Sequence, residues 1–153
     1  MNFNVPASLF TVGCCLISMI IAGKSTSNEN KIWFENLKHP KYPLILKYMN
    51  IIGFCFYLLF GYVLYNLFII NDIISIIITI IIIQCMGLSA LLLYKTKQLK
   101  LFFFTMLVFP ILVPVLIFLL LQIKLFLAIP VLVYLLWLVY DLSYFYRLMK
   151  LNK

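Results

Sequence analysis

Asp141 is the residue whose chemistry stands out most, because this carboxylate lies inside an apolar segment long enough to cross a membrane. Aromatic residues accompany it at i, i+3, i+7 and i+10, the four positions being Tyr134, Trp137, Asp141 and Tyr144. On a helix these side chains form one stripe. A charged side chain within a span is costly and usually faces the interior of the bundle. We therefore expect Asp141 to point into a cavity beside Trp137; the alternative is that it reaches the polar interface near Arg147.

Other groups with catalytic or metal-binding chemistry form no recognisable set. The chain has one histidine, His39, and lacks a carboxylate pair, a Cys/His dyad and a glycine-rich phosphate loop. We interpret His39 as a solvated loop residue. The cysteines lie in apolar runs without metal-ligand spacing and read as small buried or lipid-facing residues: Cys14, Cys15, Cys55 and Cys85. We therefore expect a protein that is not an enzyme, with no metal site and no required cofactor.

The composition points to a membrane protein. Of 153 residues, 66% are hydrophobic and 10% are charged, whereas soluble domains are about half apolar and a quarter charged. A water-soluble fold of this length could not cover so much apolar surface. The net charge of +8 is carried by short segments between the apolar runs, which favours topology signals and contacts with anionic lipids over nucleic-acid binding.

Five apolar segments are long enough to cross about 30 Å of hydrocarbon; they cover residues 7–23, 44–70, 73–94, 101–121 and 125–146. The third opens on an isoleucine-rich run, which we predict to be helical because a lone strand in lipid leaves its backbone unpaired. Pro110 and Pro114 each remove a backbone hydrogen bond, which predicts a kink in the fourth segment. The sequence thus predicts one all-α domain over residues 1–153, a bundle of five transmembrane helices.

Charge predicts the orientation of this bundle. With five spans, every basic residue except Lys124 falls on the side of the first loop, the third loop and the tail. The positive-inside rule then places the N-terminus outside and the first loop and C-terminus in the cytosol. We see no internal repeat, which argues against a transporter of the repeat type.

Several patches of the chain resemble the motifs of one known family of membrane proteins. Residues 33–40 (WFENLKHP) and Tyr42 resemble its W-Y-x-x-L-x-K-P-x-[FW] segment, and residues 57–61 (YLLFG) resemble its L-Y-x-x-M-G motif. Residues 134–137 (YLLW) resemble Y-L-x-W in its fifth helix, and residues 150–152 (KLN) fall on its closing R-L-N. The length and the five spans are also similar, so the chain resembles the TspO/MBR family of tryptophan-rich sensory and translocator proteins. The resemblance implies a TspO-like fold with a pocket inside the bundle, covered by the first loop.

The resemblance implies a ligand-binding role as sensor, carrier or regulator. Its ligands would be flat and apolar: a porphyrin or haem-type tetrapyrrole, with a sterol or lipid as further choices. Glycine and tyrosine also alternate every four residues at positions 53, 57, 61 and 65, which places them on one helical face. The resemblance and these helical faces together give eight candidate site residues: Trp33, Phe34, Pro40, Tyr57, Gly61, Tyr134, Trp137 and Asp141. Trp33 is either a lid over the pocket or an interfacial anchor. The glycines admit either a flat ligand or a neighbouring helix.

Two other functions stay open at this point. The chain could keep the five-helix fold and act as a scaffold or interaction protein, using helix faces for a homodimer or another partner. It could also be a small lipid or drug transporter, although it lacks a paired charge inside the membrane. In each case the lipid bilayer is a partner and nucleic acid is not.

Overall fold

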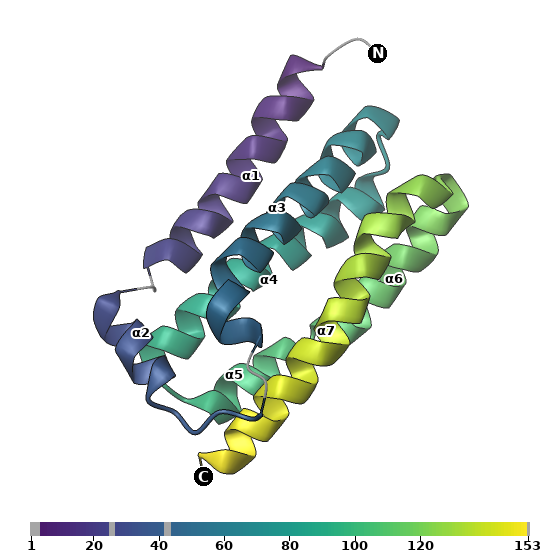
Figure 1. Ribbon diagram of the computed structural model, residues 1–153. Coiled ribbons are helices and arrows are strands. Elements are labelled where there is room, and N and C mark those ends of the chain that lie inside the picture. Colours follow the sequence, from purple (N-terminus) through teal and green to yellow (C-terminus); the bar gives the residue numbers. More distant parts are fainter. Residues whose placement is uncertain (1–3, 25–26, 42–43, 153) are drawn as a thin grey trace.

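The computed structural model describes residues 4–24, 27–41 and 44–152, and within these ranges it is helical, with no β-strand (Figure 1). The helices are α1 Val5–Lys24, α2 Asn28–Glu35, α3 Leu44–Ile70, α4 Ile73–Thr96, α5 Leu99–Met106, α6 Phe109–Ile123 and α7 Leu125–Leu151. Five stretches are long and apolar enough to cross a membrane: α1, most of α3, α4, α5 together with α6, and α7. The predicted all-α bundle of five membrane-spanning helices is confirmed. The isoleucine-rich run is helical, as expected.

The centre of the bundle is made by α3, α4, α6 and α7, and α1 packs on the outside against α3 and α4 (Figure 1). Phe60, Leu64 and Leu138 are among the fully buried side chains of the core. Many isoleucines and leucines instead lie exposed on the outer helix faces, where hydrocarbon is the expected solvent. Because lipid is as apolar as the core, hydrophobicity alone does not hold these helices together.

Small residues and hydrogen bonds fasten α1 to its neighbours. The Ser18 hydroxyl donates to the backbone oxygen of Ile83 at 2.6 Å and lies 2.9 Å from the Tyr57 hydroxyl. The Gln84 side chain donates to the backbone oxygen of Cys14 at 3.0 Å. Gly87 of α4 sits against Ser18, because a Cβ added there would lie 2.6 Å from the Ser18 backbone oxygen. A glycine is therefore required at this crossing for α1 to approach α4.

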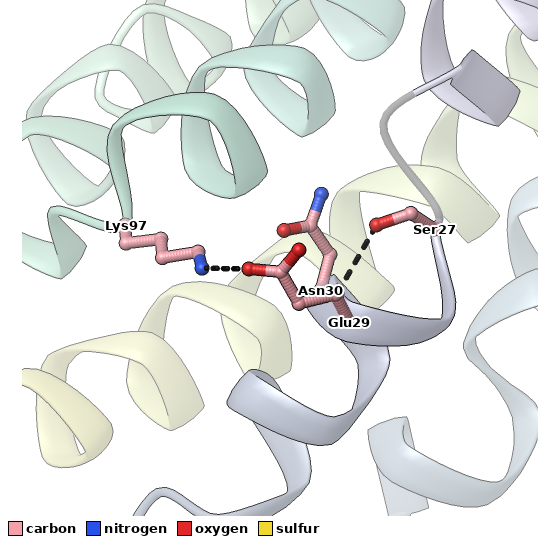
Figure 2. A network of polar contacts seen from close by, with 4 residues as sticks. All are labelled: Ser27, Glu29, Asn30 and Lys97. Atoms are coloured by element: carbon pink, nitrogen blue, oxygen red, sulfur yellow. Dashed lines mark hydrogen bonds and ion pairs between the residues drawn. The ribbon is translucent and has the colours of Figure 1, made fainter.

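The segment after α1 contains a helix where a polar loop was expected. Ser27 caps α2, its hydroxyl accepting a hydrogen bond from the Asn30 backbone N–H at 3.2 Å (Figure 2). Glu29 of the first turn pairs with Lys97 at 3.2 Å (Figure 2), and its negative charge also suits the helix N-terminus. The hydroxyl cap and the acidic first turn explain why so polar a sequence becomes helical.

The first loop, the α4–α5 connection and the C-terminal end of α7 lie together at one end of the bundle, and the N-terminus lies at the other (Figure 1). The Lys38 N–H donates to the Asn152 side chain at 2.9 Å, and the same side chain donates to the Lys38 carbonyl at 3.0 Å. The Glu29–Lys97 pair links α2 to the α4–α5 connection. The segments that carry the basic residues are therefore neighbours in space, as the five-span topology requires.

The fourth span is broken into α5 and α6 at residues 107–108. Pro110 has no N–H to donate to the Met106 carbonyl, and its ring would crowd that carbonyl in a continuous helix. The chain instead makes tight turns, with Leu107 N–H bonded to Phe104 O at 3.2 Å. The predicted kink is a full break just before Pro110, whereas Pro114 lies inside α6.

Candidate ligand-binding site

A pocket of about 130 Å³ lies between α3, α4, α5, α6 and α7; we call it the inner pocket. Its walls are mainly aromatic and apolar, with one carboxylate and one serine. The lining residues are Ile52, Gly53, Phe56, Met86, Ser89, Ala90, Leu93, Phe102, Met106, Phe109, Tyr134, Trp137, Asp141 and Phe145. Each of the four central spans therefore contributes a wall.

The α7 stripe supplies one wall of the inner pocket. Tyr134, Trp137 and Asp141 all line it, so the structure brings together three of the eight candidate residues. Asp141 lies on the pocket wall in this arrangement, as expected from the helical spacing. Tyr144, the fourth member of the stripe, lies beyond the pocket and bonds to His39 instead.

The α3 wall is made by Gly53 and Phe56. The Phe56 ring meets the Tyr134 ring edge to face, with centroids 4.9 Å apart, and lies 6.1 Å from the Trp137 ring. Gly53 leaves room beside them, because a Cβ added there would meet no atom within 4 Å. The hollow exists partly because the residue at position 53 has no side chain.

The helix break forms the opposite wall. Met106 ends α5 and Phe109 begins α6, so the two lining residues flank residues 107–108. The Phe109 and Tyr134 rings are 6.3 Å apart in an edge-to-face arrangement. Pro110 thus contributes to the site by redirecting the chain, although it does not line the pocket.

Two further candidates, Tyr57 and Gly61, face α1 and not the inner pocket. They line a separate apolar groove of about 540 Å³, the α1–α3 groove, together with Tyr62 and Tyr65. A Cβ added to Gly61 would lie 3.4 Å from the Cys15 sulfur. The alternative in which these small residues serve helix packing therefore fits Gly61, while Tyr57 hydrogen-bonds to Ser18.

The remaining candidates lie at the basic end of the bundle. Trp33 lines a groove of about 540 Å³, the basic groove, with Lys97 and Lys100 among its walls. Phe34 is buried, with its ring 6.2 Å from Tyr94 and 6.3 Å from Phe145. Pro40 follows His39 on the loop and is half-buried. None of these three residues lines the inner pocket.

His39 is a structural bridge, and the interpretation of it as a solvated loop residue is wrong. One ring nitrogen lies 2.7 Å from the Tyr144 hydroxyl and the other 2.9 Å from the Phe34 carbonyl. Its ring also packs edge to face on Phe34, at 5.4 Å. The histidine therefore ties the loop to both α2 and α7, which the sequence position alone did not reveal.

Replacing His39 by alanine is expected to loosen this end of the bundle. The change removes two hydrogen bonds, each contributing about 1 kcal/mol, so the free energy of unfolding should fall by about 2 kcal/mol. Trypsin should then cut faster at Lys38 and Lys41 in detergent-solubilised protein. Tyr144→Phe is the matched control, because it removes one of the two bonds and should give about half the effect. Unchanged cleavage in His39→Ala would contradict the bridge.

Sequence reasoning missed most of the aromatic walls. Phe56, Phe102, Phe109 and Phe145 all line the inner pocket, yet none stands out within its apolar run. The proline pair was the one signal pointing to Met106 and Phe109, because a proline interrupts the helix at the residues just before it. Ser89 is also on the wall, but its hydroxyl donates to the Met86 carbonyl of its own helix at 2.9 Å.

The inner pocket is thus a small, mostly apolar hollow with one carboxylate on its wall. Membership of the TspO/MBR family stays a prediction from the sequence patches. A scan of the chain against models of protein families gives no match, and a search of curated proteins gives none either.

Proposed function

We propose that this integral membrane protein binds a small hydrophobic molecule inside its bundle, in the inner pocket. The observation that carries the proposal is the pocket itself: about 130 Å³ lined by six aromatic rings and one carboxylate at the centre of four spans. An apolar cavity of about 150 Å³ accepts benzene. The expected occupant is therefore of benzene size, held by ring contacts with Trp137 and Tyr134.

Larger ligands need a different place. Pockets for drug-sized molecules run from about 300 to 1,000 Å³, so a tetrapyrrole, sterol or lipid is larger than the inner pocket. The α1–α3 groove, at about 540 Å³, is within that range and is apolar, with Tyr57 and Gly61 on its wall. Our second candidate is therefore a flat apolar ligand, as the family resemblance implies, bound in this groove at the lipid face.

The scaffold alternative rests on the filled interior of the bundle. Phe60, Leu116, Leu120 and Leu138 are fully buried, and the space left between α3 and α7 is small. Against it stands Asp141, since an interaction protein gains nothing from a carboxylate on the wall of an internal pocket. The positive-inside rule places the basic end of the bundle in the cytosol under each of these functions.

Quenching of Trp137 tests ligand binding directly. Trp33 and Trp137 are the two tryptophans, so a Trp33→Phe variant leaves Trp137 as the reporter. Nitrobenzene, an apolar quencher of benzene size, should quench it with a saturable component, because ring contact inside the pocket is stoichiometric. Added cholesterol should not displace nitrobenzene, since the groove and the inner pocket share no lining residue.

The control is a Trp137→Phe variant, which leaves Trp33 at the basic groove. The quenching of Trp33 fluorescence in this variant should rise linearly with nitrobenzene concentration, as expected for collisions within a micelle. A linear response from Trp137 as well would refute small-molecule binding and favour the scaffold role.

A further inference from the structure

One carboxyl group on the wall of the inner pocket has no hydrogen-bond or ion-pair partner among the described residues. The chain has four acidic residues, and three of them lie at helix ends or in the polar α2: Glu29, Glu35 and Asp72. Asp141 alone lies in the middle of a span. Within the described ranges, the ion pair found is Lys97–Glu29, and no side chain or backbone group bonds to the Asp141 carboxylate. Ser89, the nearby hydroxyl on the wall, is bonded to Met86 instead.

The surrounding walls are lined by aromatic rings. Phe102 meets Phe145 with centroids 4.6 Å apart, and Phe56 meets Tyr134 at 4.9 Å. Trp137 completes the aromatic wall next to Asp141 along α7. Aromatic faces are negative, and they attract a cation within about 6 Å, most strongly when water is excluded. The carboxylate and the rings therefore favour the same kind of occupant.

We propose that the inner pocket binds a quaternary ammonium ion, with Asp141 as its counter-ion and the aromatic walls around its methyl groups. This rests on the proposed function and names its ligand class. A carboxylate inside a span is costly without a partner, and a bound cation offsets that cost. The pocket offers few hydrogen-bond acceptors apart from Asp141, which suits a cation that has no N–H to satisfy. A trimethylammonium group is close to benzene in size, so the volume also agrees.

Choline and 3,3-dimethylbutan-1-ol provide the test, because they have the same shape and differ in charge. Both are added to the Trp33→Phe protein in maltoside detergent, and recovery of Trp137 fluorescence from nitrobenzene quenching measures their binding. Choline should bind at least about ten times more tightly than the neutral alcohol, consistent with an added cation–π and ion-pair contribution. Asp141→Asn should reduce this preference several-fold, because it removes the ion pair and leaves the cation–π contacts, and it should weaken choline more than the alcohol, whereas Asp141→Glu should keep the preference.

The outcomes separate the two proposals. If choline and the alcohol bind equally well to the unmodified pocket, the ammonium assignment is wrong and small-molecule binding stands. The assignment is also wrong if Asp141→Asn weakens both ligands alike, because the carboxylate would then act on the pocket's shape. If neither ligand nor nitrobenzene binds saturably, both proposals fail. Thermal unfolding of each variant shows that the protein measured is folded.

Discussion

Gly87→Ala is expected to detach α1 from the bundle. The added Cβ would lie 2.5 Å from the Ser18 hydroxyl oxygen and 2.6 Å from its backbone oxygen, and a backbone atom cannot move aside as a flexible side chain can. Overpacking of this kind costs about 1–3 kcal/mol. Separation of α4 from α1 would also break the Ser18–Ile83 and Gln84–Cys14 hydrogen bonds. We expect the free energy of unfolding in detergent to fall by about 3 kcal/mol.

Gly13→Ala is the matched control, because Gly13 lies on α1 and a Cβ there would meet no atom within 4 Å. Alanine favours a helix over glycine by about 1 kcal/mol, so this variant should be neutral or slightly more stable. The two glycine-to-alanine substitutions should thus change the free energy of unfolding in opposite directions. Maleimide labelling of Cys15, in a variant with no other cysteine, should speed up in Gly87→Ala alone. Equal stability of the two variants would show that α1 does not pack closely on α4.

Gly53→Leu is expected to close the inner pocket without unfolding the protein. The side chain has room to enter, since a Cβ at this position meets no atom within 4 Å. It would occupy the space between Phe56 and Trp137. Nitrobenzene should therefore bind at least tenfold more weakly, as measured by the saturable quenching of Trp137 fluorescence. Filling a cavity of about 130 Å³ stabilises by up to about 3 kcal/mol at the usual cost of empty volume, so thermal stability should rise.

Gly13→Leu serves as the control here, because it adds the same side chain to an open position on α1, away from the inner pocket. Ligand binding should be unaffected by it. Retained nitrobenzene binding in Gly53→Leu, at normal affinity, would show that the ligand occupies another site.

The spans were predictable because hydrocarbon imposes a length and a conformation on the chain. The second predicted span, residues 44–70, has the same bounds as α3. The third predicted span and α4 both begin at Ile73. Asn71 provides the turn between them, with a positive φ of 63° that Asn tolerates well. Such boundaries follow from the polar residues, which must leave the bilayer core.

The direction in which each helix face points was not predictable in the same way. Gly53 lines the inner pocket whereas Tyr57 and Gly61 face α1. Four residues advance a helix by about 40° beyond a full turn, so a repeat of four rotates away from its starting face within three steps. Because α3 is apolar all round, no polar side marks which direction is inward. On α7, Asp141 indicated which face points inward, because a carboxylate exposed to lipid is energetically costly.

Local hydrogen bonding explains the other differences. The helix α2 depends on the Ser27 cap, a signal present in the sequence but weaker than the polar composition around it. The break at residues 107–108 needed both the proline chemistry and the packing of Phe109 to fix its place.

The outer position of α1 gives the protein a modular character. Within the described residues, α1 provides none of the walls of the inner pocket, and its contacts with α3 and α4 involve other side chains. Mutations at separate sites without shared partners add in free energy. The lining of the inner pocket and the packing of α1 can therefore be altered independently, for example by changing residues of α7 while keeping the contacts of α1 with α3 and α4.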